Sequence, residues 1–85
     1  MTEIELAPTG DHIIELLQVA AAYDNRDIDA PMIAAWGEAA ARRSWTHADA
    51  LDAIHEHYAD QTAWLVPGHV TRIIRRKRFR NWQED

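Results

Sequence analysis

Three histidines, His47, His55 and His57, are the residues best suited to chemistry, since imidazole both binds metals and transfers protons. A helical metal site needs ligands one turn apart, as in HExxH, where both histidines share a face. His55 and His57 are two residues apart and point about 200 degrees from one another on a helix. His47 lies about 12 Å further along the axis. We therefore expect no metal site, with His55 at the edge of the core and His57 in solvent.

Other catalytic chemistry has little support in the residue types. Ser44 and the threonines lack the sequence context of a nucleophile elbow. The chain has no cysteine, and its three glycines do not form a phosphate-binding loop. We expect no catalytic residue, no cofactor and no enzymatic activity.

A run of basic residues near the C-terminus is the strongest binding signal. Six of the nine basic residues fall between positions 72 and 80, with no acid among them, whereas the residues before position 72 have three arginines against twelve acids, a net charge of -9. Guanidinium groups with aromatic side chains suit phosphates, unstacked bases or an acidic protein groove, although arginines near a helix end also favour the helix dipole and solubility. The candidate residues for binding a partner or nucleic acid are Arg72, Arg75, Arg76, Lys77, Arg78, Phe79, Arg80 and Trp82.

The hydrophobic pattern that must position these residues predicts an all-α fold, a compact bundle of four short helices without strands. The predicted helices span about 11–23, 30–43, 46–60 and 67–79. We expect a single domain over 1–85, a core over about 11–79, and mobile residues at 1–8 and 81–85.

Cap and turn residues delimit the helices. Asp11 and Asp29 are expected N-caps, and Pro31 and Pro67 suit a first helical turn. Thr46 followed by Asp49 resembles a capping box with the shorter acid.

Each helix is expected to bury one face. The inward residues are predicted to be Ile13, Leu16, Leu17, Ala20 and either Tyr23 or Asp24; Ile33, Trp36, Gly37 and Ala40; Ala48, Leu51, Ile54, His55 and Tyr58; and Val70, Ile73 and Ile74. Trp36 and Trp64 are expected in the core, and Trp45 is expected to pack as a staple onto the third helix. Arg72, Arg75, Arg76 and Phe79 should share the outer face of the last helix, which Trp82 would continue.

A helix-turn-helix built from the second and third helices is disfavoured by charge. The reading helix would present Asp49, Asp52, Glu56 and Asp60 to the phosphates of a major groove. A DNA-binding regulator that uses the basic last helix remains an alternative function.

The sequence contains no run of about 18 apolar residues, so we expect a cytoplasmic protein without a membrane partner. A chain of 85 residues buries a small core, and alanine-rich faces permit close helix contact. We expect a monomer or a weak homodimer.

The order of three segments carries a family resemblance. They are LLQVAAAYDNRDIDAPMIAAWGEAA, WTHADALDAIHEHYAD and AWLVPGHVTRIIRRKR, and they cover about residues 12 to 78. This succession resembles small proteins of actinobacterial phages and prophages, which are similar to the N-terminal helical domain of phage replicative-helicase loaders. The shared positions are helical core residues and a proline corner, and include Tyr23, Trp36, Trp64, Leu65 and Pro67.

The resemblance implies an adaptor that contacts a host or phage replication protein, with the replicative helicase as the suspected partner. Helicase loaders carry a long C-terminal segment that engages the helicase, whereas this sequence ends in FRNWQED. The basic segment with Phe79 and Trp82, or the helical body, would then contact the partner. An inhibitor of another host protein is a further alternative.

Overall fold

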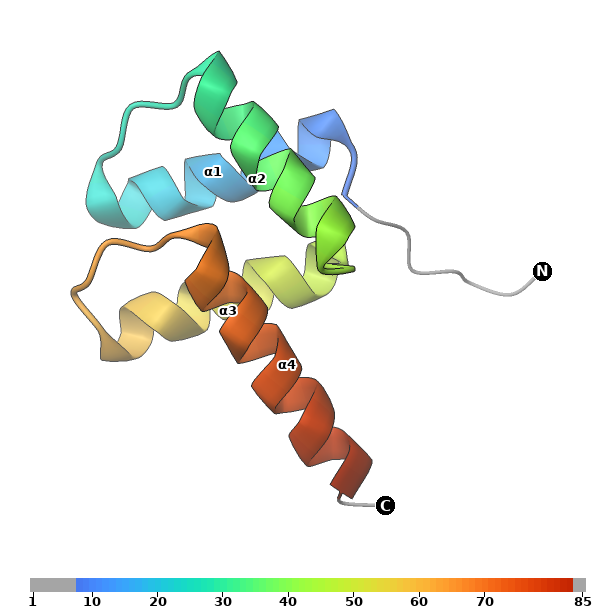
Figure 1. The fold of residues 1–85 in the computed structure, drawn as a ribbon. Coiled ribbons are helices and arrows are strands. Elements are labelled where there is room, and N and C mark those ends of the chain that lie inside the picture. Colours follow the sequence, from blue (N-terminus) through green and yellow to red (C-terminus); the bar gives the residue numbers. More distant parts are fainter. Residues whose placement is uncertain (1–7, 84–85) are drawn as a thin grey trace.

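Four α-helices make up the fold, as predicted (Figure 1). The structure, a computed structural model, describes residues 8–83, with side chains through residue 80, and this part contains no strand. The helices are α1 (Gly10–Asp24), α2 (Ala30–Arg42), α3 (His47–Asp60) and α4 (Pro67–Gln83). Helix α4 continues to residue 83, beyond the predicted end at residue 79. The expectation of mobile termini otherwise concerns residues 1–7 and 84–85, which lie outside the described residues.

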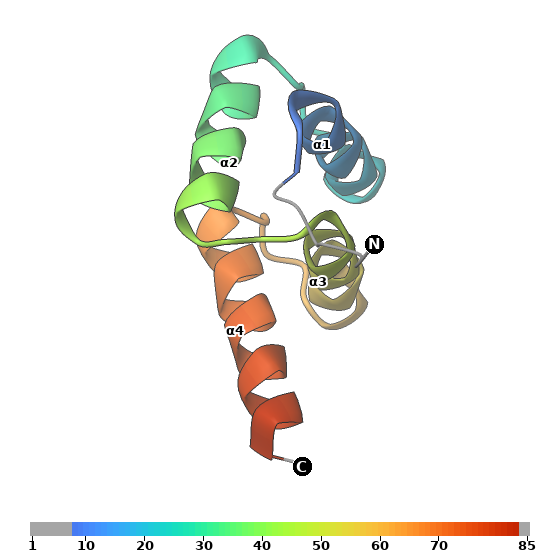
Figure 2. The same ribbon diagram turned by 90° about the vertical axis from the view of Figure 1, so that its right-hand side faces the viewer.

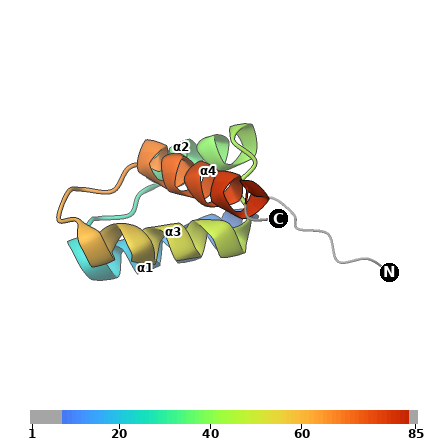
Figure 3. The same cartoon turned by 90° about the horizontal axis from the view of Figure 1, so that it is seen from below.

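The helices are arranged in two layers, with α1 beside α3 in one and α2 followed by α4 in the other (Figures 2 and 3). The α1–α2 and α3–α4 connections both lead from the first layer to the second, and the α2–α3 connection returns to the first, so that the pairs α1–α2 and α3–α4 are arranged alike. Helix α3 packs against both α1 and α4, whereas α2 contacts α4 only where the end of α2 meets the start of α4. This arrangement leaves the outer side of the α2–α4 junction uncovered.

Side-chain caps explain where three of the helices begin. Asp29 and Thr46 cap α2 and α3 as predicted, by accepting hydrogen bonds from the backbone N–H groups of Met32 and Asp49. The prediction of Asp11 as the cap of α1 is wrong, because the preceding Thr9 takes this role and His12 completes its capping box. The Asp49 carboxylate binds Arg78 instead of closing a capping box with Thr46.

One hydrophobic core joins the four helices. The inward faces of α1 and α4 are as predicted, except that Tyr23 is half exposed. In α2, Trp36 and Ala40 are buried, and Ile33 is partly buried. In the predicted stripe of α3, Ile54 is buried and Leu51 and Tyr58 are partly buried against the core, but the prediction is wrong for Ala48 and His55, which are exposed. The buried set is Ala50, Ala53, Ile54 and His57. This set has helical i, i+3, i+4, i+7 spacing, and its two alanines are small enough for α1 and α4 to approach α3 closely.

The tryptophans divide between core and surface. Trp36 is buried as predicted, and its ring meets that of Trp45 edge to face, with centroids 6.0 Å apart. Trp45 extends further into the core than a staple requires: it is 1% exposed, and its Nε1 donates a hydrogen bond to Thr71 on α4. The prediction of a buried Trp64 is wrong, because Trp64 is 52% exposed and the adjacent Leu65 fills the core. No helix of the described part is both long and apolar enough to cross a bilayer.

Candidate functional site

Three of the predicted binding residues on α4 pair with carboxylates of α3. Asp49, Asp52 and Glu56 lie at i, i+3 and i+7 along α3 and therefore line one side of that helix. The pairs are Arg76 with Glu56 at 3.0 Å, Lys77 with Glu56 at 2.9 Å and with Asp52, and Arg78 with Asp49 at 2.8 Å. The hydrogen bond from Lys77 lowers the pKa of Glu56, and the bond to Asp52 raises the pKa of Lys77. The charges of α3 and α4 therefore largely neutralise one another where the helices meet.

The remaining predicted residues of α4 face elsewhere. Arg72, Arg75 and Arg80 form no ion pair with any described residue. Phe79 is 59% exposed on the same outer face as Arg72 and Arg75, as the helical spacing predicts. Trp82 lies within the backbone of α4, and its side chain is outside the described residues.

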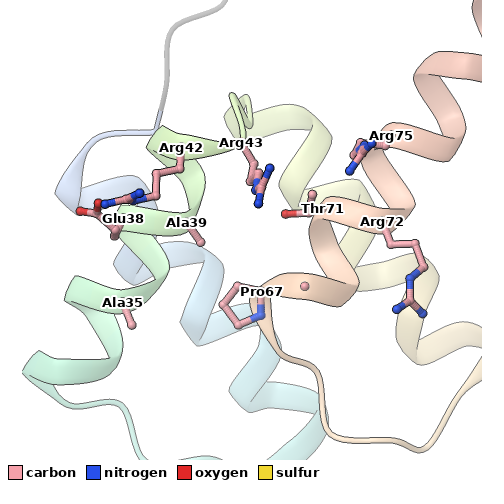
Figure 4. Close-up of a pocket in the computed structure, with 10 residues that line it drawn as sticks. Ala35, Glu38, Ala39, Arg42, Arg43, Pro67, Thr71, Arg72 and Arg75 are labelled. Atoms are coloured by element: carbon pink, nitrogen blue, oxygen red, sulfur yellow. The ribbon is translucent and has the colours of Figure 1, made fainter.

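A basic groove forms where α2 ends and α4 begins, and we call it the arginine groove (Figure 4). Arg43, directly after α2, and Arg75 of α4 both extend into the gap between the two helices, on either side of Thr71, whereas Arg72 points away from it. The groove has a volume of about 560 Å³. The small side chains of Ala35 and Ala39 and the absence of one at Gly68 leave this space open.

The polar groups around the arginine groove are mainly donors. Arg43 has no ion-pair partner among the described residues, whereas the neighbouring Arg42 pairs with Glu38 at the rim. The Thr71 oxygen accepts the bond from Trp45, which leaves the Thr71 hydroxyl proton available for a ligand. The first turn of α4 also borders the groove through Gly68 and has the positive end of the helix dipole. Such a set of donors suits an oxyanion.

A buried ion pair lies on another part of the molecule and joins the α1–α2 and α3–α4 connections. The Arg26 side chain donates to both oxygens of Asp24 and also to the Leu65 carbonyl oxygen, at 2.7 Å. Tyr58 donates its hydroxyl to Asp24 and accepts from the Leu65 backbone N–H at 2.9 Å. Burial opposes ionisation of Asp24, but the bonds from Arg26 and Tyr58 prevail and lower its pKa.

Aromatic rings cover this ion pair and form a second candidate surface, the aromatic surface, which consists of Tyr23, Tyr58 and Trp64. The Arg26 guanidinium carbon lies 4.4 Å from the centre of the Trp64 ring. Tyr23 is 49% exposed, stacks on Tyr58 with centroids 5.0 Å apart, and forms a 2.6 Å hydrogen bond with His55. The rings therefore lie at the surface, around a pocket of about 440 Å³, and contacts with the buried ion pair and with one another fix their positions.

The histidines are used differently from the prediction. His57, expected in solvent, is only 5% exposed, and its Nε2 donates to the Ala63 carbonyl oxygen at 2.7 Å. His69 stacks on His57 with centroids 4.9 Å apart and accepts at Nδ1 from the Val66 backbone N–H. In the part of the chain that the structure describes, no three or more His, Cys, Asp or Glu residues cluster so as to hold a metal ion. The histidine pair instead fixes the corner between α3 and α4.

Acidification is expected to destabilise this corner through His69. Burial, then the proximity of His57 and Arg72, lower the pKa of His69 below its ordinary value of 6.5. Its contribution to stability is therefore complete above pH 6.5 and is lost as the pH falls through the lowered pKa, because the unfolded chain binds the proton more readily. Protonation at Nδ1 would also remove the acceptor for Val66.

His69→Asn keeps a short acceptor near the Val66 N–H and does not titrate. The variant should lose less stability than the wild type between pH 7 and pH 5 in urea unfolding followed by fluorescence. Glu56, Asp60 and Arg76 also face this corner, and both proteins retain them, so the difference isolates residue 69. Equal pH slopes for the two proteins would contradict the assignment.

Comparisons of the chain with models of known protein families, with curated proteins and with solved structures gave no match. Sequence reasoning did not identify Arg43, the Asp24–Arg26 pair or the exposed position of Trp64. The spacing of Asp49, Asp52 and Glu56 was a usable signal for the ion pairs, since it places three acids on one face next to a basic helix.

Proposed function

We propose that the protein is a small non-catalytic adaptor of the helicase-loader kind, which binds a replication protein through its aromatic surface. The observation that carries this proposal is that Trp64 and Tyr23 are about half exposed and yet immobilised. Tryptophan and tyrosine dominate the energetic centres of protein interfaces. Rings that are already held in place lose little conformational freedom on binding, so more of their contact energy contributes to affinity.

The buried ion pair supports this role for the aromatic surface. Two charges removed from water contribute little net stability compared with apolar residues of similar volume. The Asp24–Arg26 pair does, however, fix the positions of Trp64 and Tyr58, by the contact of Arg26 with the indole and the bond of Tyr58 to Asp24. The Asp24–Arg26 pair is therefore suited to holding the rings of a binding surface in fixed positions.

The family resemblance suggests the first partner to test, the replicative hexameric helicase of the host. Trp64→Ala is expected to weaken this association by about 2 kcal/mol, or roughly 30-fold, as for an interface hot spot. Phe79→Ala is the matched control, because it removes an aromatic ring of similar exposure from α4. Calorimetry would measure both affinities, and circular dichroism would verify that each variant is folded.

The result would be clear in either direction. Equal weakening by Trp64→Ala and Phe79→Ala would remove the aromatic surface as the contact. Absence of helicase binding by the wild type at tens of micromolar would remove the helicase as partner. Capture of a different host protein with the same dependence on Trp64 would favour the inhibitor alternative.

The second candidate function, binding of nucleic acid, is favoured by the arginine groove. This groove lies at the α2–α4 junction, whereas Tyr58 and Trp64 belong to α3 and to the α3–α4 connection. The two activities do not compete for residues, and one adaptor can have both.

A further inference from the structure

We propose that the arginine groove and Phe79 together form a binding site for a single strand of nucleic acid, independently of any protein contact through the aromatic surface. In this arrangement Arg43, Arg75 and Thr71 bind a phosphate group in the groove. Phe79 stacks on an adjacent base. The site therefore combines one residue after α2 with one face of α4.

The arginines of the groove differ from their neighbours in lacking countercharges. In the described part, Arg76, Lys77 and Arg78 each pair with an acid of α3, and Arg42 pairs with Glu38. Arg43 and Arg75 have no such partner and extend toward the same space. Two unpaired guanidinium groups that line one groove repel one another, and an anion bound between them relieves that repulsion.

The hydrogen-bond donors of the groove match the chemistry of a phosphate group. Guanidinium groups present planar forks of N–H donors that match phosphate oxygens in pairs. The Thr71 hydroxyl oxygen accepts from the Trp45 indole and the hydroxyl donates to no group of the described residues, so its proton can reach a ligand. This bond to a buried ring fixes the Thr71 side chain, so the hydroxyl is held at the groove before a ligand arrives.

An exposed aromatic ring lies next to the groove. Phe79 follows Arg75 by four residues, so the two side chains share a face of α4 and are about 6 Å apart along the axis. A flat, exposed ring beside a phosphate site suits a base that is free to stack. Duplex DNA keeps its bases stacked inside the helix, and an acidic peptide offers no repeating flat groups. The combination therefore favours a single strand over both.

The experiment measures binding of a fluorescein-labelled 15-nucleotide oligothymidylate by anisotropy at several salt concentrations. Binding at low salt should weaken steeply as salt increases, because bound phosphates release counterions. The double substitution Arg43→Gln, Arg75→Gln removes two unpaired groove charges. It should weaken binding about tenfold or more at low salt and reduce the slope of log affinity against log salt by about 1.4.

A matched control has the same change in net charge. Arg78→Gln with Arg80→Gln removes a charge already paired with Asp49 and a charge that lies on the α3 side of α4, near Ile74. This variant should retain most of the affinity and nearly all of the salt slope. Phe79→Leu should weaken binding roughly 5- to 150-fold without changing the slope, since it removes stacking and no charge.

Each contrary result overturns the proposal. Equal losses for the two double variants would show diffuse charge attraction without a defined site. Duplex DNA bound as tightly as the single strand would exclude the role of Phe79. A poly-glutamate peptide of equal charge that binds more tightly would assign the groove to an acidic protein, and no binding at 20 mM salt (about 20 Å of screening length) would remove the site.

Discussion

Replacing Arg26 with alanine is expected to lower the free energy of unfolding by about 3–5 kcal/mol, a large share of the 5–15 kcal/mol typical of a small domain. The substitution leaves the Asp24 carboxylate buried with only Tyr58 as a side-chain partner. It also removes the donor to the Leu65 carbonyl oxygen, which is the bond that joins the two connections. Urea unfolding followed by tryptophan fluorescence would measure the loss.

The pH dependence of the unfolding free energy of Arg26→Ala distinguishes an unpaired buried carboxylate from a loss of packing. In the wild type the pKa of Asp24 is lowered, so its contribution is present above about pH 3.8 and is lost as the pH falls below that value. Without Arg26, burial acts to raise the pKa of this carboxyl group. Protonation then removes the unpaired buried charge and restores part of the variant's stability. The deficit of Arg26→Ala should therefore shrink between pH 7 and pH 4.

The double variant Asp24→Asn, Arg26→Met is the control for this interpretation. It removes both charges and keeps similar volumes, so it should recover a substantial part of the lost stability. If it is as unstable as Arg26→Ala, the loss comes from packing around Trp64 and not from an unpaired carboxylate. In either case, any protein association that the proposed aromatic surface mediates should weaken, because Trp64 loses the contact with the Arg26 guanidinium.

The sequence was sufficient to predict the helices and two of their buried faces. On α1 and α4 the core positions are occupied by large aliphatic residues such as Leu16 and Ile73, so helical periodicity alone identifies them. On α3 two of the buried positions are Ala50 and Ala53, whose small side chains carry little hydrophobic signal. The larger residues Leu51 and Tyr58 then shifted the predicted stripe toward a face that is only partly buried.

Errors at polar and aromatic positions arose from partners that are distant in the chain. His57 is buried because the Ala63 carbonyl in the following connection accepts its N–H, which helical spacing does not predict. Trp64 remains at the surface because it lies over Arg26, a residue 38 positions earlier. The arginine groove likewise depends on how closely α2 and α4 approach one another. The sequence around Arg43 therefore gives no sign that this residue lines a groove.

Replacing Trp45 with alanine is expected to destabilise the protein by about 3–5 kcal/mol, the usual range for a fully buried aromatic residue. Trp45 is 1% exposed, between α2 and α4, and its ring packs on Trp36. The loss has two separable parts, the apolar volume of the ring and the hydrogen bond from Nε1 to Thr71. Thermal unfolding by circular dichroism would measure the total.

A double-mutant cycle separates the hydrogen bond from the volume. Thr71→Val keeps its shape but leaves the buried indole N–H without a partner, which should cost about 1–3 kcal/mol. Trp45→Phe removes the donor and part of the volume. Once phenylalanine is present, Thr71→Val should have almost no further effect, giving a coupling energy of about 1 kcal/mol or more. Additive losses would show that the bond contributes nothing, and Thr71 would then need another explanation for its fixed orientation at the arginine groove.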